Sequence, residues 1–172
     1  MDFHELLSDK SKKSKAKTEV LSQWILTNPG KLHSLIEFAK KAKDPAKATC
    51  IEAIEFATKI EPAVSSVACL QFVSGMLLEN AARVKWESAK VIANIAHLYP
   101  GKLNLAINNL LINTEHEGTV VRWSAAIALA QIIKLKTILR KNLLPAIEAI
   151  CLREEQNSIR KIYLTALKKL ET

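Results

Sequence analysis

The sequence predicts an all-α protein built from stacked helix pairs, and three observations support this. The segment RVKWESAKVIANIAHLYPG at 83–101 returns in altered form at 120–136 as VVRWSAAIALAQIIKLK. Apolar residues in both segments recur at steps of three and four, the spacing of one face of an α-helix. The chain has only four glycines and five prolines in 172 residues, which leaves little material for the turns of a β fold.

One basic residue marks the same position in each copy of the repeated segment. The four copies place it at Lys47, Lys85, Arg122 and Arg160. These positions lie 38, 37 and 38 residues apart, a period typical of helical solenoids. One helix pair cannot bury its apolar stripe alone, so we expect a core that runs lengthwise through the stack.

Residues 1–17 are predicted to be a flexible basic segment. A short amphipathic turn precedes the run KSKKSKAK at 10–17, which holds five lysines and no apolar periodicity. A capping helix is predicted to begin near Thr18, with Thr18 as its N-cap, and to end at the sequence NPG at 28–30.

Residues 18–172 are predicted to form a single repeat domain. Turn and capping residues divide each helix pair, as at Asp44-Pro45, Gly118-Thr119 and Asn157-Ser158. The expected repeats are 31–61, 62–100, 101–137 and 138–172. The second helices of the pairs are expected near 45–60, 82–99, 119–136 and 157–170.

The chain resembles the HEAT repeat, a two-helix unit of about this length. The likeness rests on Val84-Lys85, Val121-Arg122 and Ile159-Arg160 early in the second helices, and on LLPAI at 143–147 in a first helix. It implies a right-handed α-α superhelix of about four helix pairs plus an N-terminal capping helix. Its second helices would line a concave face, and the family's usual activity is to hold a protein or nucleic acid there. Lysine replaces arginine in the first two repeats, and only the fourth has the proline.

Charge and cysteine usage narrow the functional class. The net charge is +8, and residues 18–172 still carry 20 basic and 14 acidic side chains, which permits an acidic partner. The three cysteines form no CxxC pair, as expected of free thiols in a reducing compartment. The start, MDFHELLSD, lacks the lysines of a signal peptide, and the longest uncharged run, 62–78, is short and polar for a membrane span. We expect a cytoplasmic protein without a membrane partner.

The repeated cation has two interpretations. It can face outward, as a row of charges that meets phosphates or acidic side chains of a partner. It can also bond an acid in an inter-helix turn and connect the repeats, as HEAT repeats do. The preferred interpretation is this structural ladder, with Glu79 beside Lys85, Glu117 beside Arg122 and Glu154 beside Arg160.

Two tryptophans occupy equivalent positions in adjacent repeats. Steps along the helix face from Trp86 and Trp123 define a predicted partner-binding patch on the concave face: Trp86, Lys90, Asn94, His97, Trp123 and Gln131. The alternative is that both indoles pack between repeats, with the N–H bonded to a turn carbonyl.

No catalytic constellation emerges from the sequence. HEAT-like alkylpurine DNA glycosylases need a carboxylate beside their groove tryptophans, whereas Lys90 and Ile127 stand four residues after Trp86 and Trp123. The four histidines do not cluster at metal-ligand spacing, and there is no glycine-rich phosphate loop. We therefore predict no enzyme activity, no cofactor, no metal and no small-molecule substrate.

The predicted function is a scaffold that binds a macromolecule, most simply a protein, on its concave face. The alternative is a nucleic-acid-binding protein that uses a basic groove containing the tryptophans. Glu52 and Glu55 fall on the first repeat's part of that face, where they interrupt a phosphate track and favour the protein partner.

Overall fold

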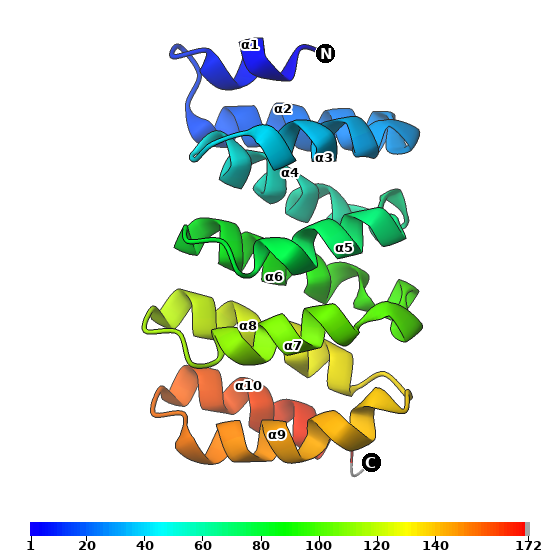
Figure 1. Cartoon of the computed structure of the whole chain (residues 1–172), viewed down its shortest axis with the longest axis vertical. Helices are drawn as coiled ribbons and strands as arrows, with labels where there is room; N and C mark the ends of the chain where they lie inside the picture. The colour runs from blue at the N-terminus through cyan, green and yellow to red at the C-terminus, as the bar shows by residue number, and fades with distance from the viewer. Residues whose placement is uncertain (171–172) are drawn as a thin grey trace.

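The computed structural model describes residues 1–170, and within them the chain is a stack of helices (Figure 1). No strand occurs in this range. The α-helices are α1 Phe3–Ser8, α2 Ser14–Thr27, α3 Leu32–Lys41, α4 Ala46–Ile60, α5 Val67–Met76, α6 Ala82–Ile95, α7 Asn104–Asn113, α8 Thr119–Ile133, α9 Leu139–Arg153 and α10 Asn157–Lys168. The last two positions of the predicted fourth repeat lie outside the described residues.

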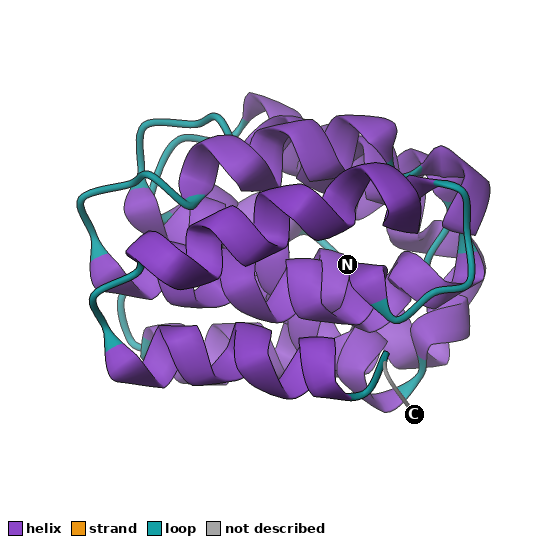
Figure 2. Cartoon of the chain, turned by 90° about the horizontal axis from the view of Figure 1, so that it is seen from below, coloured by secondary structure: helices purple, strands orange, loops and turns teal. Residues whose placement is uncertain are grey.

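The helices form two layers, which Figure 2 views along the length of the stack. The inner layer consists of α2, α4, α6, α8 and α10, each packed against the next. The outer layer consists of α3, α5, α7 and α9, and each of these packs against the inner helix that follows it. The predicted all-α, right-handed superhelix of helix pairs is confirmed.

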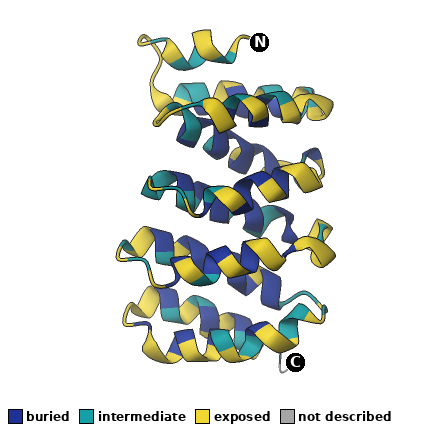
Figure 3. Ribbon diagram, viewed as in Figure 1, coloured by how far each residue is buried: buried dark blue, intermediate teal, exposed yellow. Residues whose placement is uncertain are grey.

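The core lies between the layers and between successive inner helices (Figure 3). Large side chains such as Ile54, Ile92 and Leu129 are fully buried. Alanines of the inner helices, among them Ala53 and Ala126, are also fully buried. Because alanine has only a methyl side chain, adjacent inner helices can pack closely there.

The repeats contain a short helical turn that the sequence analysis did not predict. The 3-10 helices Pro29–Lys31, Pro62–Val64 and Pro100–Lys102 each precede an outer helix. Each begins at a proline, whose fixed φ suits the start of a helix and whose missing N–H needs no partner there. In each of the first three repeats, therefore, one 3-10 turn precedes the helix pair.

The N-terminal end of the stack is covered by α1. The ring of Phe3 meets Trp24 of α2 edge-on, with centroids 5.0 Å apart, and lies 5.6 Å from the ring of Phe38. The ammonium of Lys17 donates a hydrogen bond to the carbonyl oxygen of Leu7 at 2.7 Å. These contacts connect α1 to the helices beneath it.

The predicted helix start at Thr18 is wrong, because α2 begins at Ser14. Thr18 is a buried residue inside the helix, and its hydroxyl donates to the carboxylate of Glu52 in α4 at 2.6 Å. Within the segment 1–17 the structure therefore contains both α1 and the first turn of α2. Across the described chain, none of the helices combines the length and hydrophobicity that crossing a bilayer requires.

Candidate functional site

The two tryptophans of the predicted patch differ in their surroundings. Trp86 and Trp123 lie in the first turns of the neighbouring inner helices α6 and α8. Trp86 is half-buried, and its indole N–H donates to the Oε1 of Glu87 at 2.8 Å. Trp123 is 39% exposed. Trp86 is thus partly buried, with its N–H bound to a carboxylate rather than to a turn carbonyl, whereas Trp123 presents its indole to solvent.

A buried charged cluster lies beneath Trp86. Glu55 of α4 and Glu87 of α6 are each only 4% exposed. The Nζ of Lys90 lies 3.0 Å from the Oε2 of Glu87 and 3.3 Å from the Oε2 of Glu55. Burial alone would lower the pKa of Lys90, but its hydrogen bonds and attraction to the two carboxylates outweigh burial, and the pKa is raised. Two carboxylates therefore share one ammonium group.

Two residues of the predicted patch make contacts within the molecule. The ammonium of Lys90 is held by the buried glutamates. The amide of Asn94 donates to the carbonyl oxygen of Glu55 and to the hydroxyl of Thr58, both at 3.2 Å. Both side chains point toward α4, so they connect α6 to α4 rather than extend into solvent. His97 and Gln131 are exposed, together with Trp123.

Glu52 joins three inner helices, which the sequence analysis missed. It receives the hydroxyl of Thr18 from α2 and pairs with the Nη2 of Arg83 in α6 at 2.7 Å. The partners lie more than thirty positions away on either side of Glu52. Only the stacking of the helices brings these partners together. The one sequence feature that could have suggested the contact is the basic residue Arg83, which lies two positions before the repeated cation Lys85.

The repeated cation does form a ladder, but with different partners from those predicted. Lys47 pairs with Glu79 at 3.0 Å, and the Nε of Arg122 lies 3.1 Å from the Oε2 of Glu154. Each of these cations reaches the turn of the following repeat, 32 positions later. The predicted pairing of Glu79 with Lys85 is therefore wrong, because Glu79 pairs with Lys47 of the preceding repeat and Lys85 donates to the carbonyl of Leu77 instead.

Three of the four repeated cations bind carbonyl oxygens of their own turn, and among these only Arg122 also pairs with a carboxylate of the next repeat within residues 1–170. Lys85 donates to Leu77 at 3.1 Å. Arg122 donates through Nη1 to the carbonyls of His116 and Glu117 at 2.9 and 3.0 Å. Arg160 donates through Nε to the carbonyl of Glu154 at 2.8 Å.

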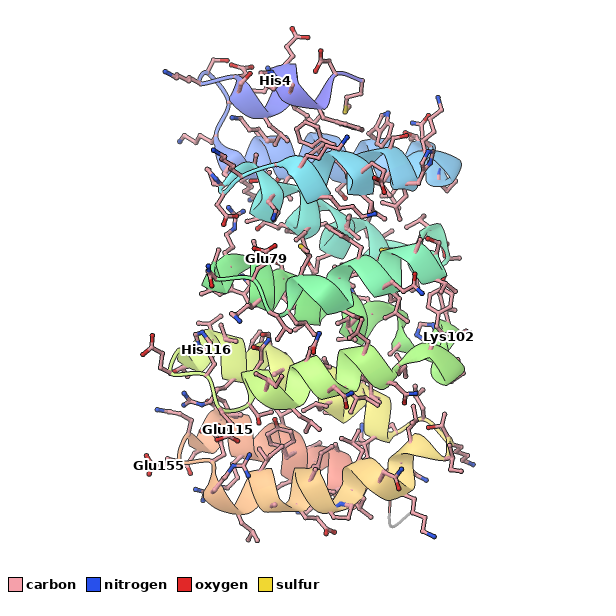
Figure 4. The ribbon with its side chains drawn as sticks, viewed as in Figure 1. His4, Glu79, Lys102, Glu115, His116 and Glu155 are labelled. Carbon is pink, nitrogen blue, oxygen red and sulfur yellow. The ribbon has the colours of Figure 1, made fainter. Side chains whose placement is uncertain are left out.

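Arg122 therefore contacts Glu117, and Arg160 contacts Glu154, as predicted. In both cases the cation binds the main-chain carbonyl oxygen of the glutamate rather than its carboxylate. The turns lie along one edge of the stack, where Figure 4 labels Glu79, Glu115 and Glu155.

Two buried asparagines in the outer layer were also missed. Asn109 and Asn113 of α7 donate through their side-chain amides to the carbonyls of Ser74 and Leu77, at 2.8 and 3.0 Å. These carbonyls belong to the C-terminal end of α5, where a helix leaves main-chain oxygens without internal partners. The asparagines occur in the apolar sequence NLAINNLLIN, and their four-residue spacing on one face was the only sign in the sequence.

Among residues 1–170, the side chains that could ligate a metal are dispersed and the thiols are buried. No group of three or more His, Cys, Asp or Glu side chains in this range is arranged to hold a metal ion. Cys50, Cys69 and Cys151 are free and buried. Burial raises the pKa of the Cys50 and Cys69 thiols to about 12, so both stay protonated at neutral pH.

Comparison with known proteins gives solved structures only. No protein-family model matches the sequence. No curated protein matches it either. An engineered protein solved by a structural genomics consortium is 20% identical with a TM-score of 0.74, and the match covers 98% of this chain and 79% of the other. A designed armadillo repeat protein is 19% identical with a TM-score of 0.68, over 98% of this chain and 80% of the other.

A second designed armadillo repeat protein was solved in complex with the peptide (KR)4. It is 16% identical with a TM-score of 0.58, and the match covers 96% of each chain. At these identities the likeness shows the fold alone. It establishes a helical-repeat solenoid, while the narrower assignment to the HEAT class stays a prediction.

Proposed function

We propose that this protein is a non-enzymatic scaffold that binds a peptide segment of a protein partner along its concave face. The observation that carries the proposal is the exposed indole of Trp123 on the inner layer. An exposed indole offers a large apolar surface and an N–H donor, and such aromatic anchors contribute most of the binding energy at many interfaces. His97 and Gln131, further along the inner layer, are also exposed and can supply polar contacts.

The buried cluster supports the binding surface from below. Glu87 accepts the N–H of Trp86, and Lys90 connects Glu87 to Glu55 on the next helix. Trp86 is thereby held in one orientation beside the exposed Trp123. A surface ordered before binding loses little conformational entropy when the partner arrives.

The structural neighbours support a peptide ligand by analogy of fold. One is a computationally designed armadillo repeat protein for modular peptide recognition, and another holds the peptide (KR)4. Glu52, Glu55 and Glu87 pair with Arg83 and Lys90 in the N-terminal half of the inner layer, which leaves fewer free cations there for a continuous phosphate track. We further propose a cytoplasmic location, since three free, buried thiols suit a reducing compartment.

The proposal is tested by selecting peptides from a random display library with the full chain as bait. Binding of the selected peptides is then measured by fluorescence anisotropy. We expect Trp123→Ala to weaken them by about tenfold or more. The matched control is Ile112→Ala, which removes an exposed apolar side chain from the outer helix α7 and should leave affinity unchanged.

Two outcomes would contradict the proposal. In the first, no peptide is selected, or the selected peptides bind the Trp123→Ala variant as tightly as the original chain. In the second, single-stranded or duplex DNA binds at physiological salt in a Trp123-dependent manner. That result would favour the nucleic-acid alternative, because purely electrostatic binding weakens steeply as salt rises.

A further inference from the structure

The inner layer contains a groove between α8 and α10 that is apolar at its base and basic at its rim. Its volume is about 300 Å³, and its lining includes Ile127 of α8 and Ile162 of α10. Lys134, Lys161 and Lys169 also line it. A cavity of this size is at the small end of ligand sites and suits one large apolar side chain rather than a whole ligand.

The lining of this groove is positively charged. None of the described residues that line it is acidic. Within the described part of the chain, neither Lys134 nor Lys161 forms an ion pair. Burial lowers the pKa of Lys134, and the nearby charge of Lys169 lowers it further. An incoming carboxylate would relieve both effects, because an opposite charge favours the ionised lysine.

The groove continues the surface around Trp123. Trp123, Ile127, Gln131 and Lys134 follow one another at helical spacing along one face of α8. A peptide anchored on Trp123 therefore reaches the groove without leaving this face. The charges also change along the inner layer, from the paired carboxylates of α4 and α6 to Lys134, directly after α8, and Lys161 of α10.

We propose that this groove binds an acidic and apolar stretch of the partner peptide. One apolar side chain lies on Ile127 and Ile162, and flanking carboxylates contact Lys134 and Lys161. The inference rests on the proposed function, whose ligand it defines further. Aliphatic walls suit an apolar side chain, whereas single-stranded nucleic acids are bound by stacking on aromatic rings.

The test uses fluorescein-labelled peptides of equal length with leucines at fixed positions. The residues that flank the leucines are glutamate, glutamine or lysine in three versions, and a fourth version keeps the glutamates but replaces leucine by serine. Anisotropy is measured with the full chain at physiological salt. The glutamate–leucine peptide should bind about tenfold more tightly than each of the other three.

Charge reversal supplies the decisive comparison. In the double variant Lys134→Glu/Lys161→Glu the preference should invert, so that the lysine–leucine peptide becomes the tighter ligand. A gain of binding cannot arise from unfolding, which protects the test from a misfolded variant. Lys141→Glu, a reversal on the exposed surface of the outer helix α9, should preserve the original order.

Failure of this inference differs from failure of the proposed function. If library-selected peptides depend on Trp123 but the glutamate peptide has no advantage, the groove assignment is wrong and the scaffold proposal stands. If no designed or selected peptide binds, both are wrong. If a single-stranded oligonucleotide binds more tightly than the glutamate peptide and displaces it, the groove is a phosphate site and the peptide assignment is overturned.

Discussion

The two buried glutamates beneath Trp86 are the residues whose placement most needs explaining. An isolated carboxylate in a protein interior is strongly disfavoured unless hydrogen bonds and a counter-charge compensate it. Glu87 has the indole N–H of Trp86 and the ammonium of Lys90, and Glu55 has the same ammonium. The cluster therefore depends on Lys90. The sequence pattern instead places Lys90 in the predicted partner-binding patch.

Replacing Lys90 by methionine should leave both carboxylates without their cation. Because the Lys90 side chain is partly exposed, we expect a loss of about 2–3 kcal/mol in the free energy of unfolding, measured by urea denaturation. The matched control, Lys59→Met at an exposed position of α4, should change stability by less than about 0.5 kcal/mol. Equal stability of the two variants would show that the cluster does not depend on Lys90.

The buried thiols predict a loss of stability in alkaline solution. The pKa of Cys50 and Cys69 is raised from 9.0 to about 12 by burial. Above pH 9 the unfolded chain therefore loses these protons while the folded chain keeps them, so the stabilisation present below pH 9 declines toward pH 12.

Each thiol should contribute about 1.4 kcal/mol per pH unit to this decline. The double variant Cys50→Ala/Cys69→Ala should show a correspondingly shallower dependence in denaturation series run on both proteins. Since lysines and tyrosines titrate equally in the two proteins, identical slopes would refute the contribution of the thiols.

Between elements, two of the repeated cations, Lys47 and Arg122, join their repeat to the next one. Arg122 binds two carbonyls of its own turn and the buried carboxylate of Glu154 in the next repeat. The guanidinium suits this position because its donors lie in a rigid fork. Lys85, with a single donor group, binds one carbonyl of its turn.

Arg122→Ala should lower the free energy of unfolding by about 2–3 kcal/mol, because it leaves the Glu154 carboxylate buried without its cation. Thermal or urea denaturation measures the change. Arg153→Ala is the matched control, since Arg153 contacts Glu115 in an exposed pair of little expected value. A similar effect of the two substitutions would contradict the ladder.

As a whole molecule, the stack is stabilised by contacts between neighbours, with few between distant repeats. A helix in the middle of the inner layer packs against inner helices on both sides, whereas α10 packs against one inner helix, α8, and the outer helix α9. The stability of such an array is roughly the sum of its units and their interfaces. The ends should therefore open more readily than the middle.

Amide hydrogen exchange should consequently show the strongest protection in α4, α6 and α8, and weaker protection in α1 and α10. The measurement is the exchange of peptides followed by mass spectrometry under native conditions. Uniform protection along the chain, or the highest protection in α10, would indicate a single cooperative unit instead.

The sequence by itself determined the repeat, the helical class and the equivalence of Trp86 with Trp123. These features depend on local periodicity and on turn residues such as Asp44-Pro45, which act within a few positions. The tertiary structure decided the partners of the charges and the exposure of the indoles. Glu79 pairs with Lys47, and the hydroxyl of Thr18 donates to Glu52. In both cases the stagger, meaning the offset of one repeat along the next, brings together residues more than thirty positions apart. Local patterns do not encode that stagger, which is set by how closely the inner helices pack.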